Sequence, residues 1–284
     1  VNNPANVKTQ YRELFTQEAV NTTEVIWARQ MSVGMTTFHD LTWRYTSGSY
    51  GQRWSLDQDF VKTYLNLDGS RHTATGEEFA REVENRDYRL GQSIITPGYT
   101  KLVGGISTAT PPDFTVTLTG YQVIKFNIDD KAYESASVSY NSLPIMRYAE
   151  VLLNYAEAKA ELNEFGDEVW NATIRPLRER AGFDAAYCSY PGSSDLRQII
   201  RDERRVELAL EGRRAFDLRR WALLDNPSLK STGATYLTTR ATGAPFLDDG
   251  SNIQCQNAYG MKYWFPIPQK ERDINANLPQ NPGW

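Results

Sequence analysis

The stretch RYAEVLLNYAEA, residues 147–158, carries the clearest structural pattern in the chain. Its apolar side chains recur three and four positions apart, which predicts a helix with one buried face. Acidic and amide side chains fall on the opposite side. The helical character starts at about Leu143, and Pro144 stands just before the helix, where its missing N–H costs little.

Further helices are expected over three segments that follow: Glu168–Arg180, Leu196–Glu211 and Arg213–Leu224. Pro176 should kink or divide the first of them, and Gly182 should end it. Together with the 147–158 helix, this segment forms a helix–turn–helix pair with alanine at the packing positions, which resembles a tetratricopeptide unit. One such pair cannot bury both of its faces, so partner helices must come from elsewhere.

The first half of the chain is dominated by turn signals. Short helices are expected around Ser55–Leu67 and Gly76–Asn85, and strands over Phe114–Leu118 and Gly120–Phe126. A loop-rich segment of this length in a compact chain is more often functional than accidental. We therefore expect three parts: a loop-rich, ligand-facing part (1–140), a helical scaffold (141–226) and a loop-rich closing part (227–284).

Composition excludes several classes of function. The net charge is −4 without a long basic run, which argues against nucleic acid as a partner. No stretch approaches the roughly 20 apolar residues of a membrane-spanning helix. The chain starts at Val1 without a signal peptide, so we expect a processed chain or a fragment. Cys188 and Cys255 lack the spacing of a zinc site, and their pairing in a disulfide stays open. We expect no metal and no cofactor.

Three glutamates, Glu203, Glu207 and Glu211, repeat every four residues and therefore stack on one helix face, where like charges repel. They could form a glycosidase-type acid/base pair, or an ion network that locks the helix to its neighbours. Nearby arginines depress a carboxylate pKa, whereas a general acid needs it raised, which favours the network. Its predicted members are Arg147, Glu203, Glu207, Glu211, Arg204 and Arg213, with Arg205 and Arg214 as further local candidates. The only two histidines stand in no catalytic motif, so we expect no enzyme.

These segments, taken in order, resemble the SusD/RagB family of nutrient-uptake outer-membrane lipoproteins. The resemblance rests on Arg147–Ala158, on ERRVEL and the following motifs over Glu203–Trp221, and on the ending from Phe265 to Trp284. Members of that family are about twice as long. The chain therefore resembles the C-terminal half of a mainly α-helical tetratricopeptide (α-α superhelix) fold, with long loops and a few short β-strands.

The resemblance implies a non-catalytic protein on the outer face of the outer membrane of Bacteroidetes-type bacteria. It would capture oligosaccharide and deliver it to a SusC-like TonB-dependent barrel. The lipid anchor would lie in the missing N-terminal half, itself a partner of this chain. Import of peptide or glycopeptide, as in the RagB branch, and a carbohydrate-active enzyme remain alternatives. A purely structural helical-repeat adaptor fits poorly, because it has no use for a long aromatic loop region.

The helix motifs look like scaffold, so we seek the ligand site in the loop-rich part. The candidates there are Trp43, Arg44, Tyr45, Tyr50, Arg53 and Trp54. Trp and Tyr offer flat faces for stacking on sugar rings, and Arg donates a fork of hydrogen bonds to hydroxyls. The same aromatics could instead pack this part against the missing half. Second-rank candidates are Tyr187, Tyr190, Tyr259, Tyr263 and Trp264.

Overall fold

The computed structural model describes residues 8–51, 53–56, 58–73, 79–192, 195–223, 267–275 and 277–281. Helices predominate there, with a few short strands, so the expected mainly helical fold is confirmed. The helices before residue 140 are α1 (Gln10–Thr16), α2 (Leu41–Thr46), α3 (Gln58–Val61), α4 (Phe79–Glu82) and α5 (Tyr88–Gly91). Those after it are α6 (Tyr148–Glu161), α7 (Asp167–Ala172), α8 (Ile174–Ala181), α9 (Ala185–Cys188), α10 (Leu196–Glu207), α11 (Arg214–Arg220) and α12 (Gln269–Ile274).

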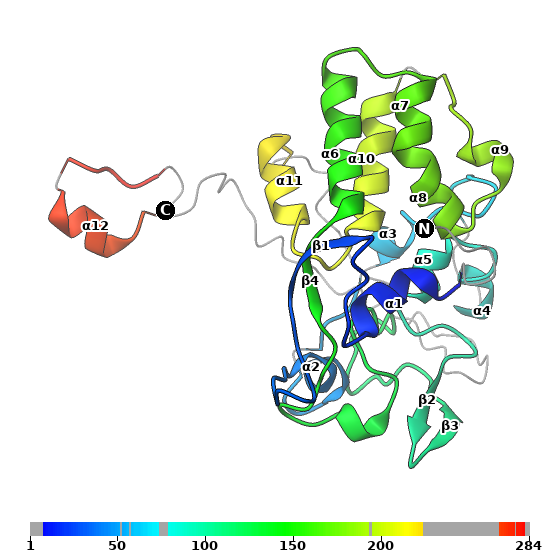
Figure 1. Cartoon of the computed structure of the whole chain (residues 1–284), viewed down its shortest axis with the longest axis vertical. Coiled ribbons are helices and arrows are strands. Elements are labelled where there is room, and N and C mark those ends of the chain that lie inside the picture. Colours follow the sequence, from blue (N-terminus) through cyan, green and yellow to red (C-terminus); the bar gives the residue numbers. More distant parts are fainter. Residues whose placement is uncertain are drawn as a thin grey trace.

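Helices α6, α7, α8 and α10 pack side by side in the upper half of the molecule (Figure 1). The apolar residues predicted to pack lie in this core: Ala149, Leu153 and Ala156 of α6 belong to one buried cluster with Trp170 and Ile200. Alanine leaves room for helices to approach closely, and the large indole of Trp170 fills the space between them. The helix-period pattern of 147–158 is therefore explained by burial of one face.

The helix α6 begins at Tyr148, so the expected start near Leu143 is wrong. Residues Leu143–Arg147 instead form the strand β4, which pairs antiparallel with β1 (Val25–Arg29). A residue before proline is pushed toward extended backbone, which favours a strand at Leu143. The strand β1 supplies the backbone hydrogen bonds that β4 needs. Because β1 lies more than 100 residues earlier in the chain, the local sequence pattern could not predict this pairing.

Three further predicted helices are divided or shortened. The segment 168–180 is split into α7 and α8 at Thr173, three residues before Pro176, which confirms the expected division. Gly182 ends α8 with a φ of +85°, and a Cβ there would lie 2.2 Å from the ring of Tyr88. α10 ends at Glu207 rather than at about Glu211, because the chain turns through left-handed backbone at Leu210 and Gly212. α11 is likewise shorter than the predicted 213–224.

The loop-rich part contains short elements around a buried central segment. Of the helices predicted around 55–67 and 76–85, the described residues show α3 and α4, and both end earlier than predicted. Residues 57 and 76–78 lie outside the described residues. The predicted strands 114–118 and 120–126 are wrong, since these residues form turns and isolated bridges. Residues 121–128 are buried on all sides, so the alternation of a half-buried strand is absent. A hairpin of β2 (Thr100–Val103) and β3 (Ile106–Ala109) forms instead, turning at two glycines with positive φ.

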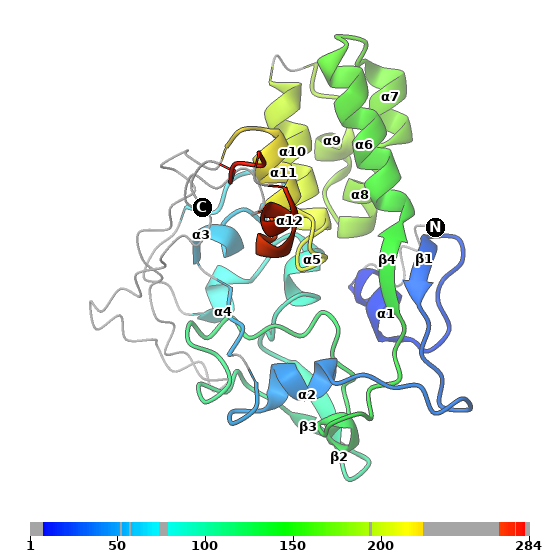
Figure 2. The same cartoon turned by 90° about the vertical axis from the view of Figure 1, so that its left-hand side faces the viewer.

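The central segment connects the loop-rich part to α1 and α2. Val123 and Phe126 form one apolar cluster with Tyr11 and Phe15 of α1 and with Tyr45 of α2. In both views α2 lies at the lower end of the molecule, below the α6–α10 layer (Figures 1 and 2). The loops around α2 therefore stand on a packed support, although they have little regular structure of their own.

Candidate functional site

The helix α2 and the loop after it hold all six predicted ligand-binding residues. On α2, Thr42 and Tyr45 are buried, whereas Trp43 is half-buried and Arg44 is exposed. Tyr45 is 5% exposed and packs in the apolar cluster of α1, and burial raises the pKa of its phenol. Tyr45 thus anchors the loop and offers no free face of its own.

Trp43 and Tyr50 form the first aromatic pair. Their ring centroids lie 5.0 Å apart, and the Arg44 guanidinium lies 4.9 Å from the centre of the Trp43 ring. Arg44 also donates a hydrogen bond to the backbone carbonyl of Tyr50 (3.2 Å). The loop reverses tightly here, because the N–H of Gly51 bonds to the carbonyl of Ser47 and a Cβ on Gly51 would lie 2.1 Å from that oxygen.

Trp54 and Tyr45 form the second pair. Their rings meet edge to face with centroids 4.8 Å apart, so the buried tyrosine supports the exposed indole. Arg53 adopts left-handed backbone with a φ of +50° and donates a hydrogen bond to the carbonyl of Phe114 (2.8 Å). We call the exposed and half-buried members the aromatic surface: Trp43, Arg44, Tyr50, Arg53 and Trp54.

The two second-rank candidates that the structure describes, Tyr187 and Tyr190, pack elsewhere. Tyr190 packs on Trp170 and Phe165 of the helical core. Tyr187 lies against the guanidinium of Arg178, 4.0 Å from ring centre to guanidinium carbon. The remaining three, Tyr259, Tyr263 and Trp264, lie outside the described residues, as does Cys255. Cys188 is buried and carries a free thiol.

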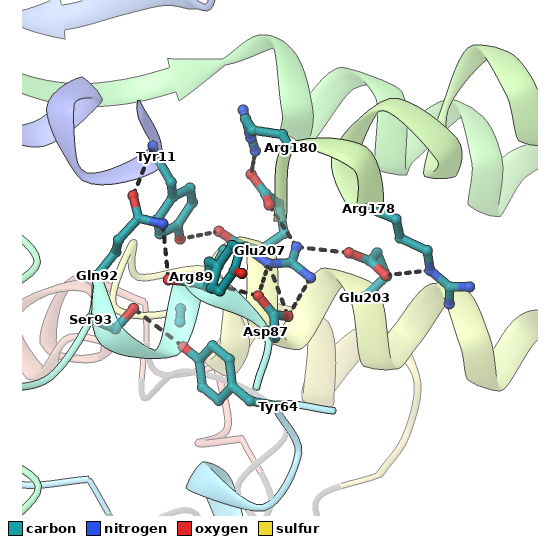
Figure 3. Close-up of polar contacts among 12 residues, drawn as sticks. Tyr11, Tyr64, Asp87, Arg89, Gln92, Ser93, Arg178, Arg180, Glu203 and Glu207 are labelled. Atoms are coloured by element: carbon teal, nitrogen blue, oxygen red, sulfur yellow. Dashed lines mark hydrogen bonds and ion pairs between the residues drawn. The ribbon is translucent and has the colours of Figure 1, made fainter. Parts of the chain in front are cut away.

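The glutamate stripe consists of Glu203 and Glu207 of α10 and of Glu211, which follows the end of that helix. Basic side chains from four other segments surround it, and Figure 3 shows three of them, Arg89, Arg178 and Arg180, beside Glu203 and Glu207. Glu207 pairs with Arg147 (2.6 Å), Arg89 (2.8 Å) and Arg180. Burial alone would raise the pKa of Glu207, but the charges of Arg180, Arg147 and Arg89 outweigh it and hold that pKa well below its ordinary value. The carboxylate is therefore ionised at any physiological pH.

The other two glutamates are held in the same way. Glu203 lies 2.7 Å from Arg89 and 3.1 Å from Arg178. Glu211 contacts Arg147 (2.7 Å) and the ammonium of Lys125 (2.6 Å). The pKa of Glu211 is lowered by these two cations despite burial, and burial lowers the pKa of Lys125 to about 8 despite Glu211. Glu207 and Glu211 therefore lack the raised carboxylate pKa that a general acid needs.

Two predicted members of this network bind elsewhere. Arg204 pairs with Asp217 of α11 (2.7 Å) and Arg213 with Glu150 of α6 (3.0 Å). The Arg204 pair joins α10 to α11, and the Arg213 pair joins the start of α11 to α6. Neither pair includes a glutamate of the stripe. Sequence reasoning missed the partners that compensate the stripe: Arg89, Arg178, Arg180 and Lys125. They come from separate segments, and no local spacing pointed to them.

Neither a metal centre nor a membrane span is seen in the part of the chain that the structure describes. No three acidic, histidine or cysteine side chains there are grouped to hold a metal ion. None of the described helices has both the length and the apolar character needed to cross a bilayer.

The chain is similar to known proteins both in sequence and in structure. The model of the SusD family matches residues 23–284. SusD-like protein P2 of Formosa agariphila is 35% identical over 153 residues, which are 51% of this chain and 26% of that protein. A SusD-like protein of Bacteroides fragilis superposes with a TM-score of 0.70 at 22% identity, covering 98% of this chain and 57% of the other. A SusD-like carbohydrate-binding protein of the same species superposes with a TM-score of 0.59 at 26% identity, covering 95% and 57%. The chain thus spans little more than half the length of these two solved relatives.

Proposed function

Because the chain belongs to the SusD family, we propose that it captures oligosaccharide on the aromatic surface and passes it to a TonB-dependent transporter in the outer membrane. Binding proteins of this family are non-catalytic. The Bacteroides fragilis protein that is 26% identical to this chain is a SusD-like carbohydrate-binding protein, which supports glycan as the ligand class here. We further propose that the protein works on the extracellular face of the outer membrane, held there by a lipid anchor.

The exposure of two large rings is the observation that carries the glycan proposal. Tyr50 is 65% exposed and Trp54 is 40% exposed, although both belong to aromatic pairs that could have been buried. A sugar ring has apolar C–H faces and a rim of hydroxyls, so it is matched by a flat aromatic face beside hydrogen-bond donors. Arg44 and Arg53 supply such donors: the Arg44 guanidinium lies over the Trp43 ring, which is paired with Tyr50, and Arg53 directly precedes Trp54 in the chain.

The support under the rings adds a second argument. Trp54 stands edge to face on Tyr45, which is anchored in the core cluster with Phe15 and Phe126. Its orientation is therefore set before ligand arrives, and a preorganised site loses less conformational entropy on binding. In this proposal residues 1–140 carry the ligand, 141–226 form the scaffold that holds them, and 227–284 close the chain.

Binding of a panel of neutral oligosaccharides, measured by isothermal titration calorimetry, tests the proposal. Trp43→Ala and Trp54→Ala should each weaken binding about two- to tenfold, since an aromatic contact contributes about 0.5–1.5 kcal/mol. Tyr155→Ala is the matched control, because Tyr155 is a similarly exposed ring on α6, away from the aromatic surface. Unchanged affinity in both tryptophan variants would remove the aromatic surface from the site. Binding of peptides in place of glycans would favour the peptide-import alternative.

A further inference from the structure

Lys125 is a fully buried cation, and each proton of its ammonium group has an acceptor. The ammonium donates hydrogen bonds to the hydroxyl of Tyr11 (2.6 Å), to the backbone carbonyl of Ala209 (2.7 Å) and to the carboxylate of Glu211 (2.6 Å). It also lies 4.2 Å from the centre of the Phe15 ring. A buried lysine is uncommon and needs such partners, and these directional contacts fix the place of the side chain.

The three acceptors belong to separate parts of the chain. Tyr11 lies on α1, whereas Ala209 and Glu211 lie in the turn that follows α10. In height, α1 lies between α2 and the layer of α6 to α10 in both views (Figures 1 and 2). Glu211 is itself held by Arg147 (2.7 Å), the residue before α6. Lys125 therefore joins the loop-rich part of the chain to the ends of both long scaffold helices.

The residues that follow Lys125 in the chain hold α2. Phe126 packs in one apolar cluster with Tyr45, and the backbone N–H of Ile128 donates to the hydroxyl of Thr42 (3.2 Å). Tyr45 and Thr42 are the buried residues of α2. The helix at one end of the aromatic surface is thus attached to the segment that the lysine holds.

The residues that precede the lysine hold the loop of Trp54. Gln122 forms an isolated antiparallel bridge with Ser55, the residue after Trp54. The backbone N–H of Leu56 donates to the carbonyl of Tyr121 (3.4 Å). Both ends of the aromatic surface are therefore attached to the same short segment, and its charged side chain is bound to the scaffold.

We propose that Lys125 is a positioning residue of the oligosaccharide site, which fixes the support of the aromatic surface against the helical scaffold. This inference rests on the proposed function of that surface. Lys125 is buried, so it acts through Phe126 and Tyr45 rather than by touching the sugar. Binding groups must be held within about 0.5 Å of their productive geometry by such supporting contacts. Three directional hydrogen bonds fix a segment in place more strictly than apolar packing of similar volume does.

The variant Lys125→Met tests this role, because it keeps the length of the side chain and removes all three hydrogen bonds. Calorimetric titration with neutral hexasaccharides of glucose and of mannose should show at least a fivefold loss of affinity. Arg204→Met is the matched control: it also removes a buried cation, which pairs with Asp217 (2.7 Å), and none of the contacts described for Arg204 involves residues 121–128. The control should lower the urea midpoint of unfolding and leave affinity unchanged.

A second measurement needs no ligand. The ¹⁹F resonance of Trp54 in protein labelled with 5-fluorotryptophan, assigned by its loss in Trp54→Phe, should shift or broaden in Lys125→Met and stay unchanged in Arg204→Met. Tyr11→Phe removes a single hydroxyl partner of the lysine and keeps the ring, so it should fold and shift the same resonance by a smaller amount.

These readouts separate the two proposals. A shifted Trp54 resonance in a protein that binds none of the hexasaccharides would support the positioning role and count against the proposed function. An unchanged resonance in both Lys125→Met and Tyr11→Phe would overturn the positioning role, whatever the wild-type protein binds. An equal loss of affinity in Arg204→Met would also overturn it, because the effect would then follow from lower stability alone.

Discussion

Arg147 and Glu207 are joined by two short contacts deep in the molecule. Nη1 of Arg147 lies 2.6 Å from Oε1 of Glu207, and Nη2 donates to the backbone carbonyl of the same residue, also at 2.6 Å. Arg147 is the last residue of β4 and stands directly before α6, whereas Glu207 is the last residue of α10. The pair therefore fixes the start of one long helix against the end of the other.

Replacing this arginine should be severely destabilising. Arg147→Met removes the guanidinium from both Glu207 and Glu211 and leaves two buried carboxylates short of a partner. Breaking a buried ion pair from one side costs about 3–5 kcal/mol, which urea unfolding can measure. Arg175→Met is the control, because the Arg175–Glu179 pair is exposed to solvent and should contribute little to stability. Equal losses in the two variants would contradict the assigned role.

Stability should fall in acid because of the same carboxylates. The folded-state pKa values of Glu207 and Glu211 are held below the ordinary value of about 4.3. Above that value their stabilisation is fully present. As the pH falls through it toward the folded-state pKa values, the unfolded chain takes up protons that the folded chain does not, so stability is lost.

Urea unfolding at a series of pH values from 7 to 3.5 measures this loss. We expect the free energy of unfolding to be nearly constant above pH 5.5 and to decline below pH 5. Glu207→Gln should be less stable than the wild-type protein at pH 7 and should show a shallower decline, because one of the linked protons is gone. A wild-type free energy of unfolding that stays flat down to pH 3.5 would be inconsistent with the ion network.

Substitutions of Tyr45 and Tyr50 should have opposite effects, because Tyr45 packs in the core and Tyr50 belongs to the aromatic surface. Tyr45→Ala should cost about 3–5 kcal/mol of stability, because it empties a site in the core cluster. Tyr50→Ala should change stability by less than about 0.5 kcal/mol, because Tyr50 is largely exposed. Oligosaccharide affinity should respond to Tyr50→Ala, whereas Tyr45→Phe should keep both stability and affinity. A large loss of stability in Tyr50→Ala would mean that the ring serves packing.

The family and the helical fold could be predicted because their signals are local. The stripe of small and apolar residues over 147–158 needs only the helical period to be recognised, and Ala149, Leu153 and Ala156 are indeed buried. The division near Pro176 and the helix end at Gly182 also follow from properties of single residues, a missing N–H and a permissive φ. The structure agrees with the sequence at each of these points.

The partners of the glutamate stripe could not be predicted in the same way. Spacing predicted that Glu203, Glu207 and Glu211 share a helix face and need cations, although α10 ends at Glu207 and Glu211 follows it. Spacing also favoured the neighbouring arginines. The structure assigns most of that role to Arg89, Arg178, Arg180 and Lys125, while Arg204 and Arg213 bind other helices. A side chain from a distant segment has no regular spacing in sequence from the glutamates, because only folding brings it close to them.

The sequence by itself determined the family, the helical scaffold and the need for a buried ion network, since these follow from period, spacing and charge along a single helix. Tertiary structure decided that Leu143–Arg147 is a strand, because its partner β1 lies far away in the chain. It also decided which aromatics are covered and which are exposed. Tyr45 and Tyr50 look alike in sequence, but only packing against α1 buries one and leaves the other available to a ligand.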